Sequence, residues 1–358
     1  MSLLFLDSSE QTAALARNVY NRQFAEDTRL ESEYDDRRKR EMYNDILYNL
    51  SYLETAMEYD DERVFNNYAV WIYYLLCHFM KELDKERIRD HMIDHYKILK
   101  EELFKVFPEE KGQKAAYHLD CAIEATKTAC AEFDPSFPFT RGRHDAWKRE
   151  YLDYMMQNNT RAAVGLVDRA VKSGISLEDV YIDILQAAMY EVGDLWHRHE
   201  ITVDKEHYCT STTQAALSQF YPLIFSQAKH GHRVLTCCVG SELHEMGIRM
   251  VSDLFEYNGW DSHYLGSAAP IDAILHSIEE FQPHLVGLSV TMPQHIIDCH
   301  KLVLEIKKRF PELKIAVGGR AFRQTDHLWK KWGVDVSTDN AIQLIAWANQ
   351  TIVLGESQ

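Results

Sequence analysis

The sequence predicts an α plus α/β protein: an N-terminal helical domain, a four-helix bundle and a C-terminal flavodoxin-like (Rossmann-type) parallel-sheet domain. Glycine and proline are nearly absent before residue 134, and apolar residues recur there at helical spacing. Residues 134–144 then bring two prolines and a glycine into a polar stretch, which is typical of a linker. From Gly231 onward, short apolar runs alternate with amphipathic patterns, and this alternation predicts a doubly wound sheet.

Residues 1–133 are expected to be helical throughout. The helical spacing is clear in one stretch, which consists of Ile46, Leu47, Leu50, Leu53, Ala56 and Met57. The segment 65–80 is aromatic or apolar on nearly every side, which predicts a buried helix. The segment 84–107 mixes charged and apolar positions as an amphipathic helix does. We therefore assign 1–133 to one helical domain and 134–144 to the linker that follows it.

Residues 145–228 form a second helical set with recognisable ends. The residues expected to cap helix starts are Thr160, Ser176 and Asp204. Asp179 follows Ser176 at the spacing of a capping box, and Gly174 fits the end of the preceding helix. Four helices in this space predict a small bundle.

Residues 229–358 contain five apolar runs separated by helical patterns. The runs are 234–239, 263–265, 285–290, 315–317 and 334–336. Repeated strand–helix units predict a parallel sheet, for which flavodoxin-like folds supply the strand order by analogy. In such a sheet the ligand site lies outside the carboxyl ends of the strands.

The bulk composition excludes several classes of partner. A formal net charge of -16 argues against a broad surface for nucleic acid or anionic membranes, because phosphate binding needs clustered lysine and arginine. The sequence contains no long uncharged apolar segment, so no membrane span is expected. The N-terminus also lacks the pattern of a signal peptide. Seven cysteines without a Cys-x-x-Cys pair indicate reduced thiols in a cytoplasm.

One strand end carries an acidic residue, a histidine and a glycine. The apolar run 233–239 is followed by Glu242, His244 and Gly247 at the predicted turn into a helix. This Glu-x-His-x-x-Gly pattern resembles the axial-histidine loop of cobalamin-binding domains, in which the acidic residue is usually aspartate. The resemblance implies that His244 is the lower cobalt ligand, that Glu242 fixes its other nitrogen, and that Gly247 lets the helix lie close to the displaced nucleotide tail.

Two further strand ends extend this resemblance, which covers residues 231–352. Ser289 matches the serine of the family's Ser-x-Leu pattern and is expected to bind the tail base, whereas Thr291 replaces the leucine. Gly318 and Gly319 match the family's Gly-Gly, where missing side chains leave room for the tail. Each motif alone is weak, since a histidine in a loop or a Gly-Gly turn is common. Their order at successive strand ends favours a cobalamin site over a plain flavodoxin-like domain.

A second signature lies in the predicted bundle. Trp196 is followed, after nine residues, by Glu206 and His207. This spacing resembles the signature of adenosylcobalamin-dependent photoreceptors, the light-sensing relatives of cobalamin-binding transcription regulators. The resemblance implies that Trp196 packs on the adenosyl group, that Glu206 binds near its sugar with His207 in support, and that His197 can take the vacated cobalt position after light. The alternative is a core tryptophan followed by a polar turn.

The N-terminal third departs from those regulators, which usually begin with a basic MerR-type helix-turn-helix. Residues 1–133 are acidic and show no basic stripe, so direct DNA binding is not expected. The stretches 45–53 and 65–71 are similar to photocobilins, photoreceptors that place a bilin beside cobalamin. The aromatic side chains spaced to share a helix face, which could line a biliverdin, are Tyr68, Trp71, Tyr74 and His78. An aromatic helix core or a dimer interface explains them equally well.

Together these observations predict a cytoplasmic light sensor rather than an enzyme. It would hold adenosylcobalamin base-off above His244, with biliverdin as a second chromophore, and change its homo-oligomeric state in light to act on a protein partner. Two alternatives stay open. A corrinoid methyl carrier of a methyltransferase system would not need Trp196 or Glu206, and a light-independent cobalamin sensor would assemble alike in dark and light.

Overall fold

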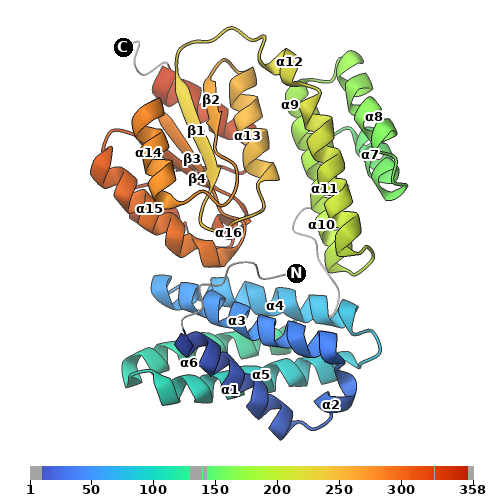
Figure 1. Cartoon of the computed structure of the whole chain (residues 1–358), viewed down its shortest axis with the longest axis vertical. Coiled ribbons are helices and arrows are strands. Elements are labelled where there is room, and N and C mark those ends of the chain that lie inside the picture. Colours follow the sequence, from blue (N-terminus) through green and yellow to red (C-terminus); the bar gives the residue numbers. More distant parts are fainter. Residues whose placement is uncertain (1–9, 130–138, 140–142, 326, 354–358) are drawn as a thin grey trace. The chain divides into compact units, whose positions relative to one another are not determined.

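The structure is a computed structural model that describes residues 10–129, 139, 143–325 and 327–353. The chain divides into two compact units, Met1–Phe133 with Gln324–Asp326, and Asp134–Arg323 with His327–Gln358. The first is helical and the second combines helices with a sheet (Figure 1). Most of the predicted linker, 134–144, lies outside the described residues. No helix in the described part of the chain has both the length and the apolar composition needed to cross a bilayer.

The N-terminal unit is built from helices with aspartates at several starts. Its helices are α1 (Glu10–Glu26), α2 (Leu30–Glu33), α3 (Asp36–Tyr59), α4 (Glu62–Phe79), α5 (Lys85–Val106) and α6 (Glu109–Thr128). Asp35, Asp61 and Asp84 cap α3, α4 and α5 by accepting hydrogen bonds from backbone N–H groups of the first turn. Helix α1 packs on α3 and α5, while α6 packs on α4 and α5. The predicted helices at 65–80 and 84–107 are therefore confirmed as α4 and α5.

The second unit begins with the predicted four-helix bundle. Its helices are α7 (Asp145–Met156), α8 (Thr160–Lys172), α10 (Ala187–His197) and α11 (Val203–Ser218). A short helix, α9 (Leu177–Asp179), and a π-helical segment over Val180–Gln186 lead directly into α10. In proteins generally, π-helical turns of this kind often accompany functional sites.

The helix ends of the bundle agree with only part of the prediction. The Ser176 hydroxyl accepts from Asp179 N at 3.1 Å, and Gly174 has a φ of +98° at the end of α8. Thr160, however, is the first residue inside α8, and Asn159 caps that helix instead. Similarly, α11 starts after Thr202, so the expected cap Asp204 lies in its first turn. Asn159 and Thr202 are themselves residue types that cap helices, which is why the sequence did not distinguish neighbouring candidates.

The C-terminal part of this unit is a parallel sheet wound on both faces by helices. The strands are β1 (Arg233–Cys238), β2 (Asp261–Tyr264), β3 (Leu285–Ser289), β4 (Lys314–Gly318) and β5 (Val336–Ser337), in the order β2-β1-β3-β4-β5. The main helices are α13 (Met246–Tyr257), α14 (Ile271–Phe281), α15 (Ile296–Arg309) and α17 (Ala341–Ala348). A short helix, α16 (Arg320–Arg323), follows β4. This order confirms the flavodoxin-like fold. Figure 1 shows α14 and α15 together beside the strands and α13 across from them.

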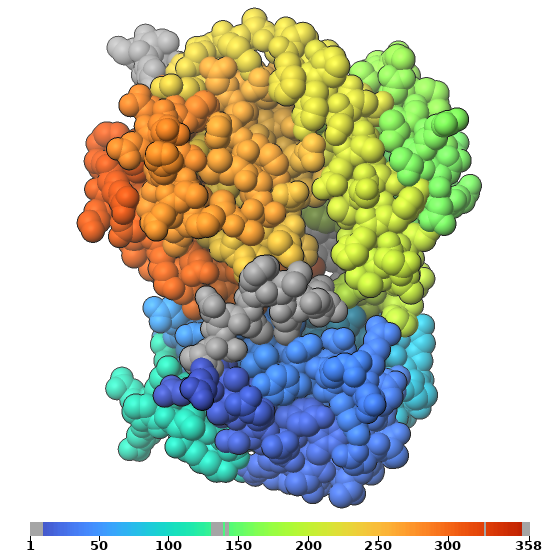
Figure 2. Space-filling model, viewed as in Figure 1, coloured from blue at the N-terminus to red at the C-terminus, as the bar shows by residue number. Residues whose placement is uncertain are grey.

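The bundle and the sheet domain share one apolar core. The short helix α12 (Tyr221–Ile224) packs on α13, and the yellow segment that contains it joins the two parts in the space-filling view (Figure 2). Two polar contacts cross the same boundary: Tyr181 Oη donates to Asp253 Oδ2 at 3.1 Å, and Arg249 Nη2 donates to Tyr221 Oη at 2.7 Å. Helix α13 is therefore held by the bundle at two positions.

Candidate functional site

The three sequence motifs of the sheet domain meet at one edge. In the parallel register, Cys238 of β1 pairs with Ser289 of β3, which in turn pairs with Gly318 of β4. These residues lie at or next to the carboxyl ends of their strands, so the loops that follow begin in one row. The site of a doubly wound fold lies at this edge.

Glu242 is the central residue of this edge. Its carboxylate is 1% exposed and accepts hydrogen bonds from His244 Nδ1 at 2.5 Å and from His244 N at 3.0 Å. The second oxygen, Oε2, accepts from the backbone N–H groups of Thr291 at 2.9 Å and Met292 at 2.8 Å. Glu242 thus joins the loop after β1 to the loop after β3. The extra methylene of glutamate, relative to the family's aspartate, lengthens the reach that spans both loops.

The charges of Glu242 and His244 stabilise each other. Burial raises the pKa of Glu242, but hydrogen bonds and charge from His244, together with the backbone donors, lower it to about 2. Burial lowers the pKa of His244, but the hydrogen bond and charge of Glu242 give a net upward shift. An ionised carboxylate can only accept, so Nδ1 of the ring donates to it. Nε2 is then left for a ligand, and half of the His244 side chain is exposed.

The glycines of the motifs have different roles. A Cβ atom on Gly247, in the first turn of α13, or on Gly318, at the end of β4, would meet no atom within 4 Å, so both face open space. Gly319 has a φ of +98°, and a Cβ atom there would lie 2.2 Å from the carbonyl oxygen of Val290. Gly319 is therefore required by the close approach of two loops, whereas the expected room for a nucleotide tail lies at Gly318 and Gly247.

Ser289 lies next to Gly318 in the sheet, because the two residues pair in the parallel register of β3 and β4. Ser289 is buried at the end of β3, and its hydroxyl makes no hydrogen bond with any residue that the structure describes. Thr291 contributes its backbone N–H to Glu242. The half-exposed imidazole of His244, the hydroxyl of Ser289 and the space at the two glycines fit a corrinoid with a displaced tail.

The residues of the bundle signature lie at the end of α10 and the start of α11. Trp196 is half-buried and His197 is buried in the last turn of α10. Glu206 accepts from Thr210 Oγ1 at 2.9 Å, and its other oxygen lies 2.9 Å from His207 Nδ1. The His207 side chain is exposed. The structure thus places Trp196 and His197 on one helix and Glu206 and His207 on the next.

The two sets of residues influence each other electrostatically. The negative charge of Glu206 is among the effects that raise the pKa of His244, and the charge of Arg320 opposes it. Arg320 also lowers the pKa of Asp194, which burial and Glu191 nonetheless raise to about 6. Bundle and sheet-edge residues therefore face a common region. Arg320 and Asp194 were not predicted, although Arg320 directly follows the Gly-Gly motif and Asp194 lies two residues before Trp196.

The aromatic residues predicted on α4 are only partly in one stack. Tyr68 is buried and stacks on Tyr52 of α3 with ring centroids 4.0 Å apart, and on Trp71 at 6.4 Å. His78 Nδ1 lies 2.8 Å from the backbone oxygen of Tyr74, within the same helix. Tyr68 and Trp71 share a face as expected, and Tyr52 is an additional member that the helical spacing of α4 alone did not reveal.

Comparisons with known proteins agree with this geometry. Residues 232–343 match the sequence model of the B12 binding domain family, and residues 147–221 match a second model with the same description. The chain is 26% identical over 158 residues to the HTH-type transcriptional repressor CarH of Myxococcus xanthus, a match that covers 43% of this chain. The chain spans about half of that relative, 51% of its length.

Corrinoid proteins match a longer part of the chain. The dimethylamine corrinoid protein of Methanosarcina barkeri is 24% identical over 211 residues, which cover 57% of this chain and 96% of that protein. The structure of the monomethylamine corrinoid protein of the same organism superposes with a TM-score of 0.52 at 18% identity, covering 58% of this chain and 99% of that one. This likeness supports the fold. With B12 binding regions in both the bundle and the sheet domain, the chain is a cobalamin-binding protein.

Proposed function

We propose that this protein is a light sensor that binds adenosylcobalamin between its bundle and its sheet edge. The observation that carries the proposal is the pairing of a complete Trp196, Glu206, His207 signature with a Glu242–His244 lower loop in one unit. The influence of Glu206 on the pKa of His244 supports their facing one another. When bound, adenosylcobalamin supplies a cobalt–carbon bond that light can break.

The lower residues would orient the cofactor. Glu242 accepts the proton of His244 Nδ1 in a hydrogen bond, which would leave Nε2 available to bind cobalt. Ser289 would donate to or accept from the base of the displaced tail, and Gly318 and Gly247 provide space for it. Thr291, whose side chain stands where the family has leucine, contributes through its backbone N–H.

The upper residues would distinguish the dark state from the illuminated state. Trp196 offers a flat apolar surface for an adenosyl group, and Glu206 offers a carboxylate to ribose hydroxyls, with His207 beside it. His197, one residue after Trp196, would become the upper cobalt ligand after light. That role requires the buried His197 side chain to leave the bundle interior, which is a structural change large enough to act as a signal.

Helix α13 provides a route for this signal. It begins two residues after His244, and the bundle contacts it through Asp253 and Arg249. A shift of the bundle would therefore move α13 and alter the surface of the unit. We propose that a homo-oligomer forms or dissociates as a result, and that a protein partner, rather than nucleic acid or a membrane, receives the signal in the cytoplasm. The protein would have no enzymatic activity.

The stacked aromatic set of the N-terminal unit is our candidate for a second chromophore, biliverdin. The support is the resemblance to photocobilins together with the stacking of Tyr68 on Tyr52 and Trp71. Protein produced with biliverdin is expected to show an added red or far-red band, which a Trp71→Ala variant should weaken.

The first experiment is to load the purified protein with adenosylcobalamin in the dark and to record its absorption spectrum and size-exclusion profile before and after green light. A protein-specific spectral change accompanied by a new elution volume is expected. A spectral change no different from that of free cofactor, with an unchanged elution volume, would contradict the proposal and favour a light-independent cobalamin sensor.

Variants separate the two faces of the site. His244→Ala should lose the His-on spectrum, whereas His276→Ala, which alters an exposed histidine on α14, should not. Glu206→Gln should retain the lower ligand and lose the preference for adenosylcobalamin over methylcobalamin. If His244→Ala takes up cobalamin with the spectrum of the unaltered protein, the assignment of the lower ligand is wrong.

A corrinoid methyl carrier is the second candidate, and the match over 96% of a dimethylamine corrinoid protein favours it. A methyl carrier should exchange methyl groups with a partner methyltransferase and should tolerate Trp196→Ala and Glu206→Gln. Loss of dark assembly in these two variants, without loss of methylcobalamin binding, would instead favour the light sensor.

A further inference from the structure

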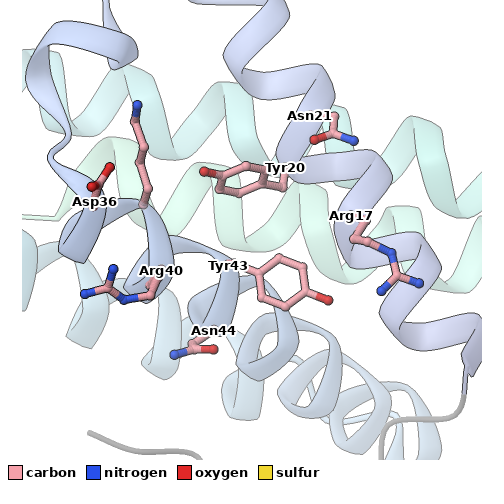
Figure 3. A pocket seen from close by; sticks show the side chains of 8 residues that line it. Arg17, Tyr20, Asn21, Asp36, Arg40, Tyr43 and Asn44 are labelled. Atoms are coloured by element: carbon pink, nitrogen blue, oxygen red, sulfur yellow. The ribbon is translucent and has the colours of Figure 1, made fainter.

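Polar side chains of the N-terminal unit gather at two places that differ in how they are partnered. The first is an open depression between α1 and α3, where Figure 3 shows Arg17 and Arg40 on opposite sides of two tyrosine rings. Asp36 lines the same depression, and Lys39 is paired with Glu31 at 2.5 Å, so positive charge does not converge on one point there. The second place lies among α3, α4 and α5, and several of its buried polar atoms have no hydrogen-bond partner among the described residues.

One face of α3 carries a carboxylate, an amide and two phenols. Asp45, Tyr48, Asn49 and Tyr52 follow the i, i+3, i+4, i+7 spacing and therefore share this face. Asp45 makes no hydrogen bond or ion pair with any residue that the structure describes. Asn49 Nδ2 lies 2.8 Å from His95 Nε2, but the buried Oδ1 of Asn49 has no partner in the described part of the chain. This face of α3 therefore offers two acceptors that lack a donor.

Hydroxyl groups from the two neighbouring helices approach this face of α3. Tyr68 of α4 stacks on Tyr52 with ring centroids 4.0 Å apart. The ring of Phe65 lies 6.1 Å from that of Tyr68 and 5.6 Å from that of Tyr96 on α5. Tyr68 and Tyr96 are 6% and 1% exposed, and their hydroxyls are buried without a partner among the described residues. Burial raises the pKa of both tyrosines and the negative charge of Asp45 adds to the shift, so these groups from three helices lie near one another.

The unpartnered groups define the chemistry of a ligand that would satisfy them. Buried polar groups without partners are rare, because each has given up its hydrogen bonds to water. A carboxylate and an amide oxygen need N–H or O–H donors, whereas phenols can donate to carbonyl oxygens. Tyr52, Tyr68 and Trp71 add flat surfaces that stack with interplanar angles of 25° and 24°. Asp45, Tyr48 and Trp71 are only half-buried, so the cluster reaches the surface. These features fit a planar conjugated molecule that carries both N–H groups and carbonyl groups.

We infer that Asp45 is the acceptor for the pyrrole N–H groups of a bilin, and that the hydroxyls of Tyr68 and Tyr96 donate to its terminal carbonyl oxygens. This inference rests on the bilin part of the proposed function. It adds the polar contacts that orient a chromophore, which stacking alone would leave free to slide. A carboxylate beside the pyrrole nitrogens also favours their protonated form, because a nearby opposite charge raises the pKa of a cationic group.

The test is a titration of the full-length chain with biliverdin in the dark, followed by absorption spectroscopy. At pH 8 Asp45 is ionised, because burial and the charge of Glu41 raise its pKa only to about 7. Asp45→Asn keeps the shape and removes the charge, so it should weaken binding by about tenfold or more, since a hydrogen bond to a charged group is lost. It should also lower the pH midpoint at which bound biliverdin loses its proton by about one unit or more. Tyr68→Phe and Tyr96→Phe should each weaken binding by roughly 3- to 10-fold.

The matched control is Asp90→Asn, which removes an exposed carboxylate from α5. Biliverdin carries two propionate groups, so the loss of a negative charge should by long-range attraction alone leave binding equal or stronger. Weaker binding in Asp45→Asn but not in Asp90→Asn therefore reports a local contact, and equal weakening in both would overturn the inference. Circular dichroism would verify that each variant folds.

The remaining outcomes separate this inference from the proposal on which it rests. Unchanged affinity and an unchanged pH midpoint in Asp45→Asn would overturn the inference and leave a bilin site standing. Affinity unchanged in both Tyr68→Phe and Tyr96→Phe would show that water satisfies the two hydroxyls, and would overturn their assignment. No binding of biliverdin to the unaltered chain would overturn the bilin proposal and this inference together.

Discussion

The sheet edge and the aromatic stack of the N-terminal unit differ in what fixes their residues. At the sheet edge, parallel register sets the position of three loops, and Glu242 ties two of them together through four hydrogen bonds. In the N-terminal unit, Tyr52, Tyr68 and Trp71 are placed by ring stacking between two helices. Register and hydrogen bonding define an orientation, whereas stacking tolerates sliding.

This difference bears on function. For His244 Nε2 to serve as the proposed cobalt ligand, its position must be fixed to within a fraction of an ångström, and the buried polar contacts of the sheet edge can provide that support. An aromatic stack can instead form part of a core without any ligand. The close approach of the loops at Gly319 should therefore be the most sensitive to change. The buried histidines of the helical unit should come next, then the hydrogen bonds of Glu242, and finally the aromatic stack.

The largest effect is expected from Gly319→Ala. The added methyl group would lie 2.2 Å from Val290 O, and the backbone there has a φ of +98°. We expect the free energy of unfolding of the second unit to fall by about 3 kcal/mol or more, measured by urea denaturation. Gly318→Ala is the control, because its Cβ atom would meet nothing within 4 Å. Equal stability of the two variants would contradict the proposed loop contact.

The next effect concerns acid and the helical unit. Burial lowers the pKa of His91 to about 4 and that of His95 to about 3, with smaller contributions from neighbouring charges. Both values lie below about 6.5, the usual value in an unfolded chain, so the unfolded state binds more protons once the pH falls below 6.5. Stability should then decline by up to about 1.4 kcal/mol per pH unit for each histidine, until the pH approaches the folded value.

Hydrogen–deuterium exchange at pH 7 and pH 5 would measure this acid effect region by region. Peptides from α1, α3 and α5 should lose protection at pH 5 more than peptides from β1 and β3. His91→Gln should reduce the pH dependence by about one proton's contribution. The lowered pKa values of His95 and His118 would remain, as would the raised pKa of Asp45, about 7, which opposes them. An N-terminal unit as resistant to acid as the sheet would contradict a neutral, buried His95.

A smaller effect is expected from Glu242→Asp. Aspartate matches the commoner family residue, but its shorter side chain cannot reach His244 and the amides of Thr291 and Met292 together with the present loop positions. We expect cobalamin affinity to fall by about 10- to 100-fold, as measured by equilibrium dialysis. Glu279→Asp, on the exposed surface of α14, should leave affinity unchanged. Unchanged affinity in Glu242→Asp would show that the loops adjust to the shorter acid.

Much of the fold was predictable because the strands are short apolar runs between amphipathic helices. The five predicted runs differ from the observed strands by two residues or fewer at every end, and the strand order followed from analogy. The π-helical segment over Val180–Gln186 was not predicted, since its residues show ordinary helical composition. Thr160 and Asp204 were misplaced as caps because adjacent residues have similar capping ability.

The candidate site was predictable only where side chains carry the signal. Glu242 and His244 follow a strand at a recognisable spacing, but the amides of Thr291 and Met292 are backbone groups that every non-proline residue has. The reason for Gly319 also differs from the expected one, because the carbonyl of Val290 that excludes a side chain comes from another loop. Arg320 resembles any surface arginine until the fold brings its charge near His244.

The smallest effect is expected in the aromatic stack, from Tyr68→Phe. The Tyr68 hydroxyl is buried without a hydrogen-bond partner among the described residues, so its removal should change the free energy of unfolding by less than about 0.5 kcal/mol. Tyr151→Phe is the matched control: it removes a buried hydroxyl that lies 3.0 Å from Thr213 Oγ1, and should cost about 1 kcal/mol. If Tyr68→Phe is as costly as Tyr151→Phe in urea denaturation, the Tyr68 hydroxyl has a partner. If that cost arises only in biliverdin-loaded protein, the stack is a chromophore site and its residues are fixed as firmly as those of the sheet edge.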